Sequence, residues 1–293
     1  MKTHMIGIGG AGMSGIAEVL KSRGDDVTGS DLKDSPYTRR LREAGITVYI
    51  GHAGRQVGDA ERVVISTAIP KTNPELLEAR RRDIPVIPRA AALASILEGS
   101  RSVAVAGTHG KTTTTSMTAH VLKALGENPT ALVCGELNDI GSNVAFGRPD
   151  LVVAEADESD RSFLYLHPKV AVVTNVEFDH PDFYSSLDDV METFVKFVRS
   201  LPAEGHLIVC ADDPRCLALA AQCPCPVTTY GIVEGDLTAE ILGPNSYALL
   251  EGGERRGTVE LGVYGRHNVL NSLAAAGVAR WLGHDAYRAA TTL

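Results

Sequence analysis

The segment Gly107–Thr113, which reads Gly-Thr-His-Gly-Lys-Thr-Thr, combines the residue types that bind a nucleoside triphosphate. An apolar run, Val103–Ala106, precedes it and a segment of helical length follows it, so it should connect a strand to a helix N-terminus. Backbone N–H groups in such a turn and the positive end of the helix dipole attract phosphate. The side chains could add a positive charge and a hydroxyl ligand for Mg²⁺. The pattern predicts an ATP site built from Gly107, Thr108, Gly110, Lys111, Thr112 and Thr113.

This loop is shorter than the usual P-loop. The usual pattern has a further glycine five residues before the Gly-Lys pair, and Val105 occupies that position here. A glycine- and threonine-rich turn that carries only a surface lysine is therefore the alternative interpretation. The flanking strand and helix favour the phosphate site, because they lie where binding requires them.

A second glycine-rich loop lies near the N-terminus, where Gly7–Gly12 has the spacing G-x-G-x-x-G. It follows an apolar segment and precedes a helical one, and Asp31 comes about twenty residues later, after the next predicted strand. Taken alone, this pattern is typical of a dinucleotide-binding dehydrogenase. The physical basis is less specific, because any nucleoside diphosphate could bind there with the acidic residue near its ribose or base. A tight turn without a ligand is the remaining alternative.

The presence of two phosphate-binding loops in one chain argues against functions that would use only one of them. A dehydrogenase leaves the loop around Lys111 unexplained. One loop for a diphosphate ligand and one for ATP together indicate a ligase or kinase that acts on a nucleotide-linked substrate. A non-catalytic nucleotide-binding protein remains the alternative.

Acidic residues follow a predicted buried strand in the middle of the chain. Leu151–Ala154 leads directly into Glu155–Asp160, which contains four acidic side chains. The carboxyl ends of strands form the edge where open α/β sheets bind ligands. Carboxylate oxygens suit Mg²⁺, so we predict a metal-binding role for Glu155, the first of these residues. A solvated acidic loop is the alternative.

Polar residues also follow the next predicted strand and begin the last predicted helix. Val170–Thr174 is followed by Asn175–Pro181, in which Asp179 and His180 could ligate a second metal ion or orient a γ-phosphate. Gly265–Asn271 opens a helix, where His and Asn side chains could cap the helix or bind an adenine edge. The spacing alone leaves both interpretations open.

The alternation of short strands and helices predicts an α/β fold. Strands are expected at His4–Ile8, Asp26–Gly29, Thr47–Ile50, Arg62–Ile65, Val86–Ile87, Ser102–Ala106, Thr130–Cys134, Leu151–Ala154, Val170–Thr174 and His206–Cys210. Helices are expected at Gly12–Arg23, Ser35–Ala44, Pro74–Arg82, Lys111–Leu125, Leu187–Arg199, Pro214–Ala221 and His267–Trp281. Antiparallel strands should follow between Val227 and Val263, with Gly252–Gly253 as a hairpin turn. The expected domains are a Rossmann-like parallel-sheet domain, residues 1–99, and a P-loop-type ATPase α/β domain with added antiparallel strands, residues 100–293.

Composition excludes several classes of partner and location. The chain has 293 residues and a net charge of −8, which argues against a nucleic-acid partner. Its five cysteines lack metal-ligand spacing and are expected to be reduced thiols. The sequence shows no signal-peptide core and no apolar stretch long enough to cross a membrane. We therefore expect a cytoplasmic protein without a membrane partner, and the sequence gives no oligomeric state.

Five motifs in this order resemble those of the Mur ligases. They are Gly7–Gly15, Gly107–Thr115, Glu155–Asp160, Asn175–His180 and Gly265–Asn271, and the similarity covers essentially the whole chain. The first and third motifs most resemble the member of the family that uses L-alanine. The resemblance implies ATP, L-alanine and UDP-N-acetylmuramate as substrates, and Mg²⁺ as the metal. A sibling that attaches a whole peptide remains the alternative within the family.

The resemblance also implies roles for individual residues. The UDP-sugar side would be formed by Gly9, Gly10, Ala11, Gly12, Asp31, His52 and Thr67. Lys111 would contact the β- and γ-phosphates, and the metal ions would be held by Thr112, Glu155 and His180. The adenine side would be formed by His267, Asn268 and Asn271. His109 and Asn175 would line the region of the muramate carboxylate and the γ-phosphate.

The chemistry implied by the family is carboxylate activation. ATP converts the carboxylate to an acyl phosphate, the alanine amine attacks it, and Mg²⁺ and lysine offset the charge repulsion. Mur ligases have a third, C-terminal domain that binds the amino acid, and this sequence stops about where that domain would begin. We therefore expect the 293-residue chain to bind its nucleotides and to ligate alanine poorly.

Overall fold

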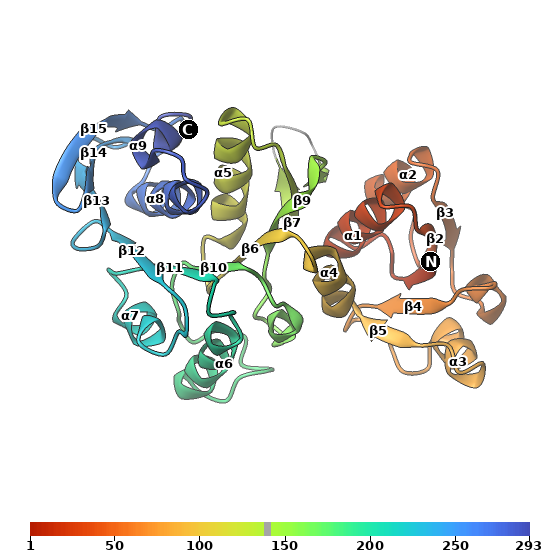
Figure 1. The fold of residues 1–293 in the computed structure, drawn as a ribbon. Helices are drawn as coiled ribbons and strands as arrows, with labels where there is room; N and C mark the ends of the chain where they lie inside the picture. The colour runs from red at the N-terminus through yellow and green to blue at the C-terminus, as the bar shows by residue number, and fades with distance from the viewer. Residues whose placement is uncertain (138–141) are drawn as a thin grey trace. The chain divides into compact units, whose positions relative to one another are not determined.

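The computed structural model describes residues 1–137 and 142–293 (Figure 1). The predicted α/β class is confirmed, with one parallel sheet and one mixed sheet. The chain forms two compact units. One contains Met1–Ile96 and Leu132–Ala145, and the other contains Leu97–Ala131 and Phe146–Leu293. The division into domains at residues 99 and 100 stays a prediction.

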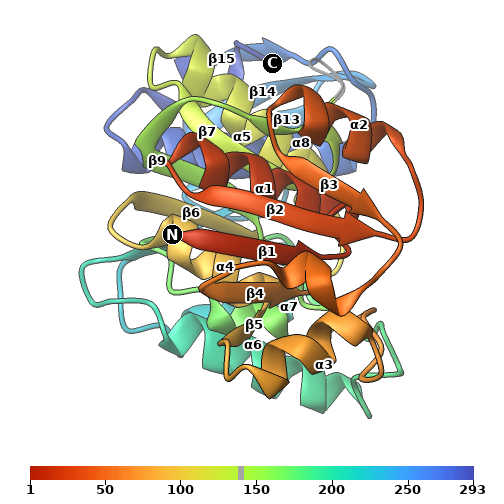
Figure 2. The same cartoon turned by 90° about the vertical axis from the view of Figure 1, so that its right-hand side faces the viewer.

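A five-stranded parallel sheet in the order β3-β2-β1-β4-β5 forms the centre of the first unit (Figure 2). Its strands are β1 (Lys2–Ile6), β2 (Asp26–Asp31), β3 (Thr47–Ile50), β4 (Arg62–Ile65) and β5 (Val86–Pro88). The helices are α1 (Ala11–Ser22), α2 (Pro36–Glu43), α3 (Pro74–Arg81) and α4 (Arg89–Leu97), with a short 3₁₀ turn, η1 (Gly54–Val57). The helix α4 was not predicted from the sequence, and it begins directly after β5 without an intervening turn.

Apolar spacing and capping residues explain these elements. The helical spacing of Met13, Ile16, Ala17 and Leu20 places them on one side of α1, and all four are buried. The α2 helix begins with a capping box between Ser35 and Thr38, and Asn73 caps α3 by accepting hydrogen bonds from two backbone N–H groups. These caps end the loops that lead from the sheet and fix where each helix starts.

A ten-stranded sheet follows, in the order β15-β14-β13-β12-β11-β10-β6-β9-β7-β8. Its strands are β6 (Arg101–Ala106), β7 (Pro129–Leu137), β8 (Ser142–Ala145), β9 (Arg148–Glu155), β10 (Val170–Val173), β11 (His206–Cys210), β12 (Val227–Gly231), β13 (Leu237–Ile241), β14 (Ser246–Glu251) and β15 (Glu254–Glu260). The accompanying helices are α5 (Lys111–Ala124), α6 (Leu187–Arg199), α7 (Pro214–Ala220), α8 (Arg266–Trp281) and α9 (Ala286–Ala290), with a 3₁₀ turn, η2 (Ser162–Tyr165).

The pairing of these strands separates a parallel part from an antiparallel part. The strands β9, β6, β10, β11 and β12 run parallel, and β13 also pairs parallel with β12. The antiparallel strands predicted between Val227 and Val263 are confirmed for the pairs β13–β14 and β14–β15, whereas β12, which begins at Val227, belongs to the parallel part. Gly252 and Gly253 form the turn between β14 and β15, both with positive φ. Because β6, β9 and β10 are parallel neighbours, the loops that follow them meet at one edge of the sheet.

Candidate functional site

The loop between β6 and α5 depends on a glycine at its first position. Gly107 has a φ of +135°, and a Cβ placed there would collide with the Thr174 side chain. That hydroxyl is already bonded to the carbonyl of His109 at 2.6 Å. The sequence therefore places Gly107 where the backbone of the loop passes against the end of β10.

The end of β10 also holds the loop through Asn175. Its Oδ1 accepts a hydrogen bond from the His109 N–H at 2.9 Å, and its Nδ2 donates to the His109 carbonyl at 3.0 Å. Its own carbonyl accepts from the Thr108 N–H at 3.0 Å. The His109 side chain is 64% exposed, with Nε2 3.7 Å from Glu177. In this structure Asn175 therefore fixes the position of the loop backbone at His109. The predicted catalytic roles of Asn175 and His109 stay predictions.

Lys111 folds back over this loop at the start of α5. Its Nζ donates to the carbonyls of Gly107 at 2.8 Å and Thr108 at 3.1 Å, and to Glu158 Oε1 at 2.9 Å. Glu158 is only 2% exposed, and its Oε2, although 2.9 Å from Nζ, accepts no well-aligned hydrogen bond from the described residues. Burial raises the pKa of the Glu158 carboxyl, and the Lys111 ammonium opposes that rise. The ammonium is thus held beside the loop by a buried counterion.

Thr112 and Glu155 meet next to this ion pair. The Thr112 hydroxyl lies 3.1 and 3.0 Å from the two carboxylate oxygens of Glu155, which is the last residue of β9 and is paired in register with Val105. Glu155 is 6% exposed. The structure therefore brings together two of the three predicted metal ligands, and both present oxygen atoms.

His180 lies beside Glu158. Its Nε2 is 3.7 Å from Glu158 Oε1 and 3.7 Å from Asp179 Oδ2. Within residues 1–137 and 142–293, no group of three or more His, Cys, Asp or Glu side chains is arranged to hold a metal ion. The role of His180 as a metal ligand stays a prediction.

The start of α8 lies against the start of α5. Asn271 is 7% exposed, its Oδ1 accepts from the Thr114 hydroxyl at 3.1 Å, and its Nδ2 donates to Asn268 Oδ1 at 3.2 Å. Asn268 in turn donates to the Tyr264 carbonyl at 2.8 Å, and the His267 ring lies beside Gly265. In this structure the two asparagines connect α8 to α5 and to the preceding loop, and their predicted adenine contacts stay untested.

The contacts of Glu158, Tyr184 and Arg161 near this site depend on the fold and not on local sequence pattern. Glu158 was recognised only as part of an acidic segment, because its direction depends on how the chain turns after β9. The Tyr184 hydroxyl donates to the Glu158 carbonyl at 2.6 Å, and Arg161 lies over the Tyr184 ring at 4.8 Å. Arg161 also bonds the Phe183 carbonyl at 2.8 Å and Asp189 at 2.7 Å. These contacts tie the loop that carries His180 to the loop that carries Glu158.

In the first unit, Asp31 contacts the glycine loop, and its predicted contact with a nucleotide stays a prediction. The Gly9 N–H donates to Asp31 Oδ2 at 2.9 Å, and α1 begins at Ala11. A Cβ at Gly12 would overlap the guanidinium of Arg89, which follows β5. Arg89 is a cation at the start of α1 that the sequence analysis missed, because nothing in its local pattern relates it to Gly12.

His52 and Thr67 follow β3 and β4 and differ in their surroundings. Thr67 is exposed. His52 belongs to a buried network around Glu75, which accepts hydrogen bonds from His4 Nε2 at 2.9 Å, Ser30 Oγ at 2.5 Å, His52 Nδ1 at 3.1 Å and the Ala53 N–H at 3.1 Å. Burial disfavours ionisation of Glu75, but the bonds from His4, Ser30 and His52 outweigh it and lower the pKa of the carboxyl.

Replacing Glu75 with alanine is expected to lower the free energy of unfolding by about 3 kcal/mol. His4 is completely buried and would lose its acceptor. Because the folded-state pKa is depressed, the stabilisation by the carboxylate is present above the ordinary glutamate pKa and is lost as the pH falls through the lowered value. Urea unfolding of the wild-type chain and of Glu75→Ala, at pH 7 and at decreasing pH, measures the difference between their free energies of unfolding. If this difference grew as the pH fell, the stabilising role of the Glu75 carboxylate would be contradicted.

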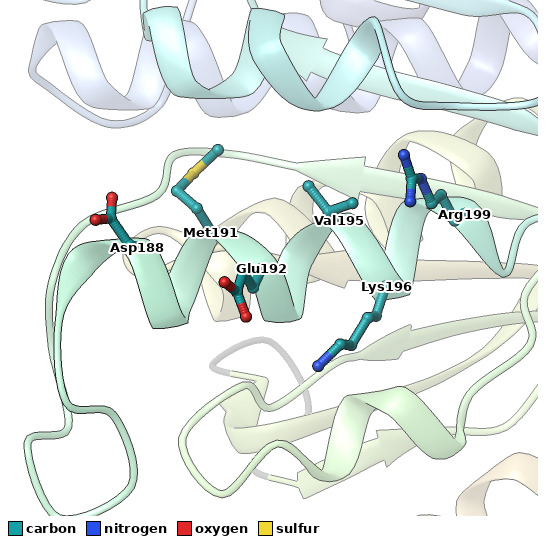
Figure 3. Close-up of a pocket in the computed structure, with 6 residues that line it drawn as sticks. All are labelled: Asp188, Met191, Glu192, Val195, Lys196 and Arg199. Atoms are coloured by element: carbon teal, nitrogen blue, oxygen red, sulfur yellow. The ribbon is translucent and has the colours of Figure 1, made fainter.

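The described residues also form a hollow along α6, shown in Figure 3. It is lined by Asp188, Met191, Glu192, Val195, Lys196 and Arg199. None of the predicted site residues is among them. Among the described residues, no helix is both long and apolar enough to cross a membrane.

Comparison with known proteins identifies the family. The Mur ligase middle domain matches residues 105–279, and the Mur ligase family catalytic domain matches residues 2–101. The chain belongs to the Mur ligase family. Both glycine-rich loops lie within the two matched regions, so the predicted family resemblance is confirmed.

Relatives of this Mur ligase chain include UDP-N-acetylmuramate–L-alanine ligases. The chain is 75% identical over 293 residues to that of Rubrobacter xylanophilus, which covers 100% of this chain and 66% of the relative. It is 46% identical over 291 residues to that of Aquifex aeolicus, covering 96% and 63%. The chain thus spans slightly less than two thirds of the length of these relatives.

Solved Mur ligase structures share the fold. A UDP-N-acetylmuramate:L-alanyl-γ-D-glutamyl-meso-diaminopimelate ligase from Neisseria meningitides has a TM-score of 0.91 and 31% identity, covering 100% of this chain and 97% of that one. The UDP-N-acetylmuramate–alanine ligase of Thermotoga maritima has a TM-score of 0.87 and 33% identity, covering 100% and 68%. Both contain the arrangement of elements on which the candidate site of this Mur ligase chain is built.

Proposed function

We propose that this chain contains the UDP-sugar-binding and ATP-binding parts of an ATP-dependent ligase that joins L-alanine to the carboxylate of UDP-N-acetylmuramate. The observation that carries the proposal is the 75% identity, over all 293 residues, to the L-alanine ligase of R. xylanophilus. Residues 1–99 would bind the UDP-sugar and residues 100–293 would bind ATP. We place this step of peptidoglycan precursor synthesis in the cytoplasm, where ATP is present.

The geometry around Lys111 supports the proposed ATP site. The ammonium lies at a glycine-containing loop and a helix N-terminus, two features that attract phosphate. Thr112 and Glu155 offer oxygen donors side by side, as Mg²⁺ prefers, so these residues fit the metal and would hold it with His180 nearby. When bound, Mg²⁺ would neutralise part of the charge of the triphosphate. His267, Asn268 and Asn271 would lie toward the adenine.

The proposed reaction needs no nucleophile from the protein. A carboxylate oxygen of UDP-N-acetylmuramate attacks the γ-phosphorus of ATP, and ADP leaves. The alanine amine then attacks the carbonyl carbon of the acyl phosphate, phosphate leaves, and the amine loses a proton. From its place beside Glu158, Lys111 would offset the repulsion between carboxylate and triphosphate.

A peptide in place of L-alanine is a second candidate substrate. The TM-score of 0.91 to the N. meningitides ligase, whose name specifies a tripeptide, favours it. The 75% identity to an L-alanine ligase favours alanine. Competition between labelled L-alanine and the tripeptide for UDP-N-acetylmuramate, in a protein that contains this chain, would distinguish the two.

Replacing Asp31 with alanine is expected to weaken binding of UDP-N-acetylmuramate about tenfold, because Asp31 lies against Gly9 in the proposed diphosphate loop. Replacing Lys111 with alanine should leave this binding unchanged. Isothermal titration with the sugar nucleotide measures both affinities. Asp59→Ala is the matched control, since Asp59 is an exposed carboxylate of the same unit. The reverse pattern for Asp31 and Lys111 would mean that the two loops have been assigned to the wrong ligands.

A further inference from the structure

The Glu75 network connects two strands of the first sheet and the helix α3 with the loop that carries His52. His4 and Ser30 come from β1 and β2, and Glu75 lies in the first turn of α3. His4, Ser30 and Glu75 are completely buried, whereas the His52 side chain is 11% exposed. His52 is therefore the member of the network that reaches the surface.

The hydrogen bonds determine which nitrogen of His52 carries the proton. Glu75 is an ionised carboxylate that can only accept, and Ser30 Oγ donates its proton to Glu75. Ser30 Oγ, at 3.0 Å, and Glu75 Oε1, at 3.1 Å, therefore both face His52 Nδ1 as acceptors. Nδ1 must carry the proton, and in the neutral ring Nε2 is then an acceptor.

The position of His52 is one where α/β sheets bind ligands. Gly51, the residue before it, donates its N–H to the Asp31 carbonyl at 2.8 Å, and Asp31 contacts the glycine loop through Gly9. His52 thus lies at the carboxyl edge of β2 and β3. Within the described part of the chain, both hydrogen bonds of the His52 ring involve Nδ1, so Nε2 remains available to a ligand.

We propose that Glu75 is a positioning residue that holds His52 in the Nδ1–H tautomer, so that Nε2 accepts a hydrogen bond from an N–H or O–H group of the bound nucleoside. This inference rests on the proposed binding of a uridine nucleotide by the first unit. The donor is the imide N–H of uracil or a ribose hydroxyl. Cytosine has no proton at the same ring position, so the first case would also select uracil against cytosine.

The free protein provides a first test. Nitrogen-15 NMR of the histidine rings at pH 8, above the ordinary histidine pKa, distinguishes a protonated from an unprotonated Nδ1. We expect the Nδ1–H tautomer for His52 in the wild-type chain and in Ser30→Ala, which retains the Glu75 acceptor, and a mixture of tautomers in Glu75→Ala. An Nε2–H tautomer in the wild-type chain would overturn the proposal, even if Glu75→Ala does not fold.

Ligand titrations provide the second test. UDP should bind Glu75→Ala about tenfold more weakly than the wild-type chain and Ser30→Ala within about twofold. For the wild-type chain, about tenfold weaker binding of CDP identifies the uracil N–H as the donor, and about tenfold weaker binding of 2′-deoxy-UDP identifies the ribose hydroxyl. Equal affinities for all three nucleotides, or for UDP in all three proteins, would overturn the inference. Failure of UDP to bind the wild-type chain would instead contradict the proposed function.

Discussion

Replacing Lys111 with alanine is expected to weaken binding of ATP at least about a hundredfold. The substitution removes the cation at the proposed phosphate site. It also leaves the buried carboxylate of Glu158, which Lys111 now pairs with at 2.9 Å, without a counterion next to a polyanionic ligand. Both the lost cation and the unpaired carboxylate weaken the binding of ATP. Isothermal titration with ATP and magnesium measures the change.

Lys123→Ala is the matched control for this experiment. Lys123 lies near the other end of α5 and is exposed, so its loss removes one charge from the same helix without touching the loop. Its affinity for ATP should stay within about twofold of the wild type. Binding of ATP to the Lys111 variant within about threefold of the wild type would contradict the assignment of this loop to ATP.

Replacing Gly107 with alanine is expected to destabilise the chain by about 3 kcal/mol and to abolish detectable ATP binding. The new methyl group would meet the Thr174 hydroxyl, and the backbone atoms of Thr174 and Asn175 lie 3.1 Å from its position. Thr174 cannot turn away without breaking its bond to the His109 carbonyl. The loop must therefore move away from β10. Urea unfolding and titration with ATP measure the two effects.

Gly126→Ala separates steric collision from backbone strain. Gly126 also has a positive φ, +88°, but an added Cβ would have no atom within 4 Å. Its substitution should cost only the left-handed backbone penalty of about 1 kcal/mol and should leave ATP binding unchanged. Equal losses of stability in Gly107→Ala and Gly126→Ala would show that collision with Thr174 does not contribute to the destabilisation.

The sequence predicted the parts of the fold that depend on local pattern. Alternating strands and helices indicated the parallel sheets, and Gly252–Gly253 indicated the turn of an antiparallel pair. The helix α4 was missed because it follows β5 with no turn residue between them. The grouping of Leu132–Ala145 with the first unit could not be predicted, because it depends on long-range contacts such as Asn143 with Ser14 on α1.

The candidate site was predictable where it depended on strand ends. Glu155 ends one of three parallel neighbouring strands, and Asn175 and the loop before Lys111 follow the other two, so topology brings them together. The partner of Lys111 was not predictable, because sequence spacing does not show which of the acids after Glu155 turns inward. The network around Glu75 was missed for a similar reason, since its members are up to 71 residues apart.

The double attachment of His109 to Asn175 has a thermodynamic consequence. Both polar groups of the His109 peptide backbone are already bonded to one side chain that follows β10, and the neighbouring Thr108 is bonded as well. The loop is thus preorganised, so binding of an anion costs little conformational entropy of the loop backbone. Asn175→Ala should therefore make association with a nucleotide more entropically unfavourable.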